Sequence, residues 1–158
     1  MRNWFIGGGA VAVTALTVLF VVTAPSDEDL IRQAIAESSR ASSEGKPGGV
    51  LEYIDPAFLF NNNPSFDRNE IAKAVRLAKP QVEFSSFEPV VEGDEATVVA
   101  DVKVKLDYFS FNIDENLPGV EVRLKKTTGV RWLVFPGTKW KITEVSAPQL
   151  AQYSRGAF

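Results

Sequence analysis

The spacing of apolar residues changes twice along this 158-residue chain, and each change marks a different kind of structure. Residues 4–24 form an uncharged apolar run. Between Pro25 and Pro80 the apolar residues recur every three or four positions, which predicts helices. After Pro80 they recur at every second position, which predicts strands. The pattern therefore predicts an apolar segment followed by one α+β domain whose helices precede its sheet.

The apolar segment, residues 4–24, has the length needed to cross a membrane once. As a helix it would be about 31 Å long, and the hydrocarbon core of a bilayer is about 30 Å thick. Arg2 precedes the segment and acidic residues follow it at 27–29, so the positive-inside rule places the N-terminus in the cytoplasm and the domain outside. We expect a single-pass protein of the cell membrane, with residues 1–25 as N-terminus and anchor.

A cleaved secretory signal is the alternative for this segment, because signals also begin with a positive charge and end in small residues. Signal cores are usually shorter than this run, and Pro25 would occupy the first position after the cut, where its fixed backbone fits a peptidase poorly. Both alternatives place the domain outside the cytoplasm.

Helix-start signals divide the part before Pro80. Ser26 with Asp29, and Asp67 with Glu70, have the spacing of capping residues at the start of a helix. The expected elements are a helix from about 27 to 41, a short helix over 50–54 ended by Asp55-Pro56, an extended segment at Phe58 and Phe60, and a helix from 67 that ends at Pro80.

Alternation is clearest between residues 95 and 109. Ala96, Val98, Ala100, Val102, Val104 and Leu106 fall on one face of the predicted strand, and mostly polar residues fall on the other. The other expected strands are 82–91, one that begins at 120, 131–135 and 139–145, with turns at 92–94 and 136–138. Residues 127–129 are either a turn or a bulge in one long strand. A polar tail follows at 148–158.

Charge and composition exclude several classes of function. The domain after Pro25 holds all 20 acidic residues and all but one of the 17 basic residues, so it lacks the net positive charge that binds nucleic acid. The short basic clusters, Arg123 with Lys125 and Lys126, and Lys139 with Lys141, are interpreted as a solvated sheet face. The chain contains no cysteine and no histidine, which excludes the common zinc sites and Ser-His or Cys-His catalysis.

The element order resembles that of the nuclear transport factor 2-like superfamily, which includes ketosteroid isomerase and the SnoaL-like, polyketide-cyclase-like proteins. Three segments carry the resemblance: Asp-Pro-Ala-Phe at 55–58, the turn and strand at 92–98, and Trp-Lys-Ile-Thr-Glu-Val at 140–145. The resemblance covers about residues 26–147. It implies a cone-shaped α+β domain in which the helices close over a concave sheet face and leave a pocket.

In enzymes of this superfamily the pocket holds Asp, Tyr or His groups. The resemblance implies that this pocket would be lined by Val98, Ala100, Val102, Val104, Val122, Leu124, Trp140 and Ile142. None of these side chains can act as a general base. Tyr53 and Asp55 are the remaining weak catalytic candidates, although Asp55 before a proline is more simply a turn residue and Tyr53 more simply a core residue.

The alternation of apolar and polar residues shifts by one position after Tyr108. As a result, Phe109, Phe111 and Ile113 fall on the face that carries the charged residues before Tyr108. One interpretation is a bulge that returns these side chains to the core. The other is an exposed patch for a protein partner or a second copy of the domain, which Trp132 would extend. Asn112, Asp114 and Asn116 have the spacing of a calcium loop, but the position that needs glycine is a leucine, so we expect no metal.

Together these features predict a membrane-tethered, non-enzymatic binding or assembly module outside the cytoplasm. Its expected partners are the lipid bilayer, through residues 4–24, and a protein or a second copy; no cofactor is expected. The alternatives are a pocket enzyme of the isomerase or dehydratase kind, acting through Tyr53 and Asp55, and a carrier of a small hydrophobic ligand.

Overall fold

The structure is a computed structural model that describes residues 25–64, 67–108, 111–131 and 135–150. Within these ranges no helix is both long enough and apolar enough to cross a bilayer. The predicted membrane segment, residues 4–24, lies outside the described residues and stays a prediction.

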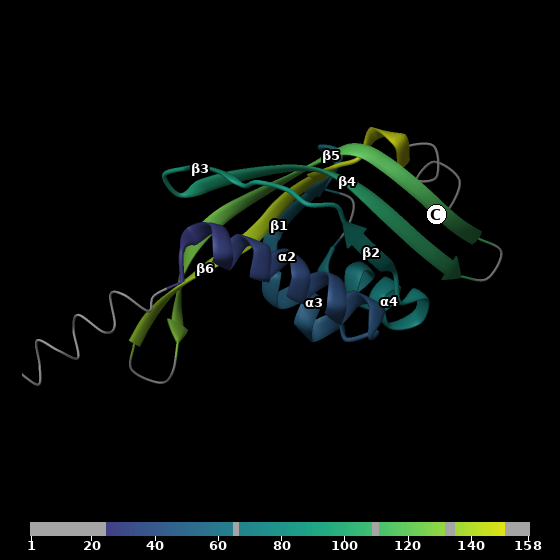
Figure 1. Cartoon of the computed structure of the whole chain (residues 1–158). Helices are drawn as coiled ribbons and strands as arrows, with labels where there is room; N and C mark the ends of the chain where they lie inside the picture. Colours follow the sequence, from purple (N-terminus) through teal and green to yellow (C-terminus); the bar gives the residue numbers. More distant parts are fainter. Residues whose placement is uncertain (1–24, 65–66, 109–110, 132–134, 151–158) are drawn as a thin grey trace, which may run out of the picture.

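Three helices of the described part lie on one side of the sheet (Figure 1). They are α2 (Asp27–Ser43), α3 (Pro47–Tyr53) and α4 (Arg68–Ala78). Both predicted caps are confirmed: the Ser26 side chain accepts from the backbone N–H of Asp29 at 3.1 Å, and Asp67 and Glu70 form a reciprocal capping box. Helix α3 begins three residues earlier than predicted because Pro47 suits the first turn of a helix, where no N–H is needed.

The strands form one mixed, mostly antiparallel six-stranded sheet in the order β1-β6-β5-β4-β2, with β3 paired to β4. They are β1 (Ile54–Phe60), β2 (Gln81–Phe84), β3 (Val90–Glu92), β4 (Glu95–Tyr108), β5 (Phe111–Arg131) and β6 (Phe135–Ser146). Strand β1 runs parallel to β6, and the other pairs are antiparallel. A short 3-10 helix, Pro148–Leu150, follows the sheet.

The shift in alternation after Tyr108 marks a reversal of the chain. Tyr108 pairs with Phe111 across the β4–β5 ladder, and Ile113 lies opposite Leu106. Leu106 and Ile113 thus lie on the same face of the sheet, although one has an even and the other an odd number in the sequence. Strand β5 begins nine residues before the predicted position and continues through 127–129 without a turn.

Two other expectations about the strands were wrong. The predicted turn at 136–138 lies inside β6, where Pro136 pairs with Val130 and Gly137 with Gly129. Strand β1 pairs with β6 only from Ile142 onward, so β6 has a free edge here, and a proline at a free edge removes no ladder hydrogen bond. The predicted strand 82–91 is divided into β2 and β3.

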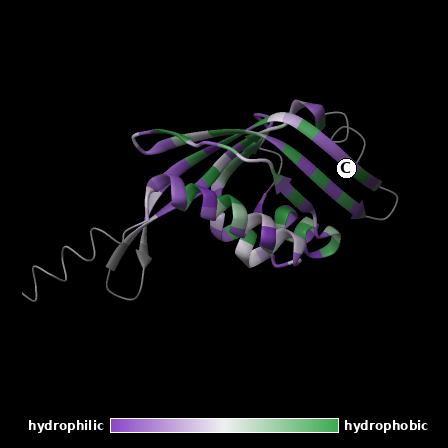
Figure 2. Ribbon diagram, viewed as in Figure 1, coloured by the Kyte–Doolittle hydropathy of each residue, from purple (hydrophilic) through white to green (hydrophobic). Residues whose placement is uncertain are grey.

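The main core lies between helix α2 and the concave face of the sheet. Ile31, Ala34 and Ile35 of α2 pack on buried residues of β4, β5 and β6. Figure 2 shows the alternation of apolar and polar residues along these strands that places every second side chain in this core. A smaller cluster of Ala41, Val50, Ile54 and Val75 joins α2, α3, β1 and α4.

Candidate functional site

The residues predicted to line a pocket all face the helices, and most of them form the core itself. Val98 is 0% exposed and Trp140 is 1% exposed, and Ala100, Val102, Val122, Leu124 and Ile142 are also buried. Val104 is partly buried and packs against the same core. Because α2 packs directly on this face, the side chains that would line a pocket contact one another and the helix.

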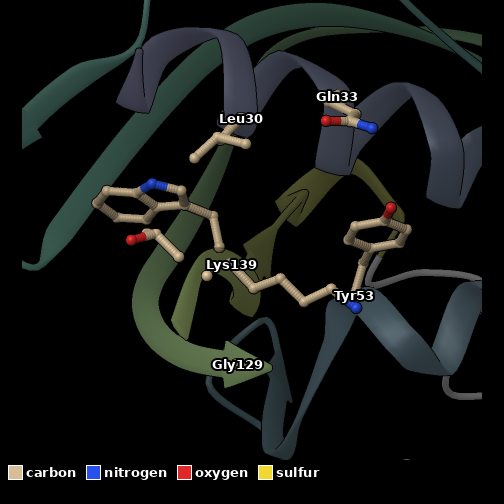
Figure 3. A pocket seen from close by; sticks show the side chains of 8 residues that line it. Leu30, Gln33, Tyr53, Gly129 and Lys139 are labelled. Atoms are coloured by element: carbon tan, nitrogen blue, oxygen red, sulfur yellow. The ribbon is translucent and has the colours of Figure 1, made fainter. Parts of the chain in front are cut away.

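A small cavity remains at one end of the concave face, between α2, α3 and the β5–β6 hairpin (Figure 3). Its volume is about 110 Å³, and its lining residues are Leu30, Gln33, Tyr53, Gly129, Gly137, Thr138, Lys139 and Trp140. Pockets for small ligands usually measure roughly 300–1,000 Å³. Of the residues predicted to line a pocket, only Trp140 borders this cavity.

Helix α2 is bonded at its first residue to the strands that border the cavity. One Asp27 oxygen accepts from the indole Nε1–H of Trp140 at 3.1 Å, and the other accepts from the Lys126 ammonium at 2.9 Å. The hydrogen bond from Lys126 lowers the pKa of Asp27, and the hydrogen bond from the indole and the positive charge of Lys126 lower it further. Partial burial of the carboxylate has the opposite effect. These residues are too far apart in the sequence for any local pattern to indicate the cluster.

Tyr53 lines the cavity, with the Lys139 ammonium 5.7 Å from its ring centre and extended toward it in Figure 3. Lys139 is also paired with Glu52. Burial raises the pKa of the Tyr53 hydroxyl, so this group stays protonated at neutral pH and is a poor general base. Among the described residues that line the cavity, none carries a carboxylate.

Asp55 does not share this cavity. It lies in β1 and borders a separate open groove, and its Oδ1 accepts from the backbone N–H of Ala57 at 2.8 Å. This is the local turn bond expected of an aspartate before a proline. The two weak catalytic candidates, Tyr53 and Asp55, therefore border different hollows.

The open groove has a volume of about 580 Å³ and lies between α3, the start of β1, α4 and the β5–β6 hairpin. We call it the basic groove. Its lining residues are Gly48, Leu51, Glu52, Asp55, Arg68, Thr127, Thr128, Gly129, Lys139 and Lys141. Lys139 and Lys141, interpreted from the sequence as part of a solvated face, here border a concave surface.

The predicted partner patch lies only in part within the described residues. Phe109 and Trp132 lie outside the described residues. Phe111 and Ile113 belong to the start of β5, and Ile113 is partly buried, whereas Arg131, the residue before Trp132, ends the same 21-residue strand. The patch as a whole therefore stays a prediction.

The outer face of the sheet carries two exposed valines that the sequence analysis missed. Val99 is 58% exposed on β4, and Val90 is 59% exposed on β3. Val90 pairs with Thr97, so the two valines are diagonal neighbours on one face. Val99 is the one large apolar residue at an outward position of β4 between 95 and 107, and this interruption of the polar face was the signal available in the sequence.

The described residues contain no group of three or more His, Cys, Asp or Glu side chains that could hold a metal ion. Asn112, Asp114 and Asn116 lie in the extended strand β5, opposite Asp107, Lys105 and Lys103. Their alternation places them in a row along the outer face, whereas a calcium loop must curve around its ion.

Comparison with solved structures identifies the fold. An NTF2-like protein from Cytophaga hutchinsonii matches with a TM-score of 0.60 and 15% identity, over 77% of this chain and 97% of that protein. An NTF2-like protein of unknown function in nutrient uptake from Rhodospirillum rubrum matches with a TM-score of 0.59 and 16% identity, over 73% and 94%. A conserved protein from Planctomyces limnophilus matches with a TM-score of 0.56 and 16% identity, over 76% and 93%.

This chain thus has the nuclear transport factor 2-like fold, as the resemblance implied. No model of a protein family matches the sequence, and no curated protein matches it. At these identities the structural likeness shows the fold alone, and that fold carries many unrelated functions. The site itself must therefore support any statement about function.

Proposed function

We propose that this chain is a non-enzymatic binding or assembly module, tethered to the cell membrane by residues 4–24 with its domain on the extracytoplasmic side. The observation that carries the proposal is the filled concave face. Trp140, Val98 and their neighbours, which in a pocket enzyme would surround a substrate, pack against helix α2. The fold then offers its outer surfaces for binding.

The position of helix α2 supports a close tether. Only Pro25 and Ser26 separate the predicted membrane segment from the first residue of α2. Asp27, that first residue, is bonded to both β5 and β6. A membrane-spanning segment at 4–24 would therefore hold the domain near the bilayer surface, with little freedom at the junction.

Exposed apolar residues support a protein partner, which is either another protein or a second copy of this chain. Val90 and Val99 form a small apolar spot among charged residues on the outer face, and the predicted aromatic patch at 109, 111, 113 and 132 would add to it. Large apolar side chains surrounded by polar ones are typical of contact sites between proteins.

Two measurements test the proposal. A reporter enzyme that is active only outside the cell, fused to the carboxyl end, should be active; a stable but silent fusion would contradict the topology. Crosslinking in intact membranes, followed by mild detergent extraction, should recover the chain in a complex larger than one copy. A chain recovered alone and monomeric would contradict the assembly role.

The cavity beside Tyr53 favours a second candidate, a small-ligand site of an enzyme or carrier. Its polar groups come from Tyr53, Gln33 and Lys139, but its volume of about 110 Å³ suits only a very small molecule. Native mass spectrometry of the full chain should show no bound metabolite. A bound molecule that is lost in Tyr53→Phe would favour this second candidate.

A further inference from the structure

The basic groove holds more positive charge than its own acids neutralise. Arg68, Lys139 and Lys141 face two carboxylates, those of Glu52 and Asp55. Glu52 is paired with Lys139. Among the ion pairs of the described residues, none includes Arg68 or Lys141. The charges of Lys139 and Glu52 cancel, and the charge of Asp55 offsets one of the two other cations. One net positive charge therefore remains in the groove.

Asp55 is only partly available to Arg68 or Lys141. One of its oxygens accepts the backbone N–H of Ala57 at 2.8 Å, and that bond fixes the carboxylate against its own strand. Neither cation approaches it closely enough for an ion pair in the described structure, although all three residues border the same groove. Neither cation is therefore neutralised by an ion pair, and both can bind an anion.

The ladder between β5 and β6 adds to the positive field. Lys141 pairs directly with Lys125, and like charges in opposed positions of antiparallel strands destabilise the pair. Lys125 has Glu95 opposite it on its other neighbouring strand, β4. Lys141 has no such acid, so an anion in the groove would relieve the repulsion between the two lysines.

Helix α3 and the first residue of β1 position the guanidinium of Arg68. Its Nη1 donates to the carbonyl oxygen of Ile54 at 3.4 Å, and its Nη2 donates to that of Leu51 at 3.3 Å. These bonds are long and use two of the five N–H donors, so the group is held at the groove with donors to spare. An arginine fork together with a lysine ammonium is the pair of groups that proteins use to bind phosphate oxygens.

We propose that the basic groove binds a phosphate group through Arg68 and Lys141. The phosphate comes either from the headgroup of an anionic membrane lipid or from a soluble phosphorylated compound, because both present the same oxygens. The groove volume of about 580 Å³ lies within the usual range for a small ligand. The proposal holds whether or not residues 4–24 cross a bilayer.

Two probes and two matched pairs of variants test this site in the full chain, purified in a neutral detergent. Calorimetry measures binding of inorganic phosphate, and native mass spectrometry measures retained phosphatidylglycerol against phosphatidylcholine. Lys141→Gln and Arg68→Gln remove the two proposed contacts. Lys73→Gln and Arg76→Gln make the same change of charge at exposed positions on α4, away from the groove.

Each groove variant should weaken binding by about threefold to tenfold, and each control by less than about twofold. Selective retention of phosphatidylglycerol with weak binding of phosphate identifies a lipid headgroup, and tight binding of phosphate identifies a soluble compound; both support the site. Thermal unfolding of all four variants, measured without ligand, shows that each is folded at the temperature of the binding measurement, which separates binding from folding. If Lys141→Gln and Lys73→Gln bind both probes equally, or if neither probe binds the wild type, the proposal is overturned.

Discussion

Alternate residues of strand β6 lie in two different environments, although Lys139 also borders the small cavity beside Trp140. Trp140 and Ile142 are buried against helix α2, whereas Lys139 and Lys141 border the basic groove. Neighbouring residues of this strand thus belong either to the filled concave face or to an open, charged surface. The pleat of the strand is the cause, since successive side chains point to opposite faces.

This contrast indicates where function resides in this version of the fold. The concave side, which gives enzymes of the superfamily their pocket, is occupied here by apolar side chains and one satisfied indole. The packing of these side chains stabilises the fold. The outer side of the sheet and the groove beside α3 keep exposed charges and apolar spots, and these are the surfaces through which we propose the domain binds.

Loss of Trp140 should have the largest effect on the filled side. Trp140→Ala removes the largest fully buried side chain of the described residues, so we expect about 3–5 kcal/mol less unfolding free energy, measured by denaturant unfolding of the full chain in detergent. Trp140→Phe keeps most of the packing but leaves Asp27 without the indole donor, so it should cost about 1–2 kcal/mol. Equal and small losses in both variants would contradict a filled core.

Val98 and Val99 compare the two faces directly, because they are neighbours on β4. Val98→Ala should cost about 1.5–3 kcal/mol, since the side chain is 0% exposed and its removal leaves a cavity. Val99→Ala should change the unfolding free energy by less than about 0.5 kcal/mol, since that side chain is 58% exposed. Losses of similar size at both positions would show that the faces do not differ as described.

Gly48 and Gly49 make the same comparison on helix α3. A Cβ at Gly49 would lie 2.7 Å from the Cβ of Ala41 on α2, so Gly49→Ala should cost about 1–3 kcal/mol by forcing the helices apart. A Cβ at Gly48, which borders the groove, meets nothing within 4 Å. Gly48→Ala should therefore stabilise the helix by about 0.5–1 kcal/mol, and thermal unfolding of both variants checks the opposite signs.

Asp27 should give a smaller effect than Trp140, Val98 or Gly49, and one that depends on pH. Its pKa in the folded chain is lowered below the ordinary value of 3.8, so its ionised form stabilises the fold above that pH, and this stability is lost as the pH falls through the folded pKa. The carboxylate is partly exposed, so solvent screening limits the contribution to about 1 kcal/mol. Asp27→Asn should be less stable than the wild type near neutral pH.

The difference between the wild type and Asp27→Asn should disappear in acid unfolding measurements below the folded pKa, because both side chains are then uncharged. Asp29→Asn is the control, since Asp29 is exposed and makes no bond to β5 or β6. A difference that is constant with pH would contradict the ion pair with Lys126.

The elements that the sequence could predict are those with a local physical cause. The caps at Ser26 and Asp67 depend on residues three positions apart, and the inward face of β4 depends on a period of two. The general layout of helices followed by a sheet follows from these signals, and so does the resemblance to the superfamily.

The remaining features depend on contacts between distant residues or on weak turn signals. The reversal between Tyr108 and Phe111 has no Gly, Pro or Asn at its centre, so it looked like a slip in one strand. Pro136 and Gly137 indicated a turn but lie on a free sheet edge. The Asp27–Trp140 bond joins residues 113 positions apart.

The sealed concave face was also beyond the sequence. An apolar face of the sheet can either line a pocket or form part of a packed core. Which of the two is present depends on how close α2 lies to the sheet, and the sequence does not give that distance. The basic groove was missed for a related reason, because Arg68 on α4 and Lys141 on β6 are far apart in the sequence and border one groove only in the folded chain.

Thiol labelling tests the filled concave face most directly, because the chain has no cysteine of its own. Val98→Cys and Val99→Cys place single thiols on the two faces of β4, and the rate of reaction with a water-soluble thiol reagent is measured in the native full chain. We expect the thiol at 99 to react at the rate of a free thiol and the thiol at 98 to react only after unfolding. Equal rates at the two positions would mean that water reaches the concave face, and would contradict the account.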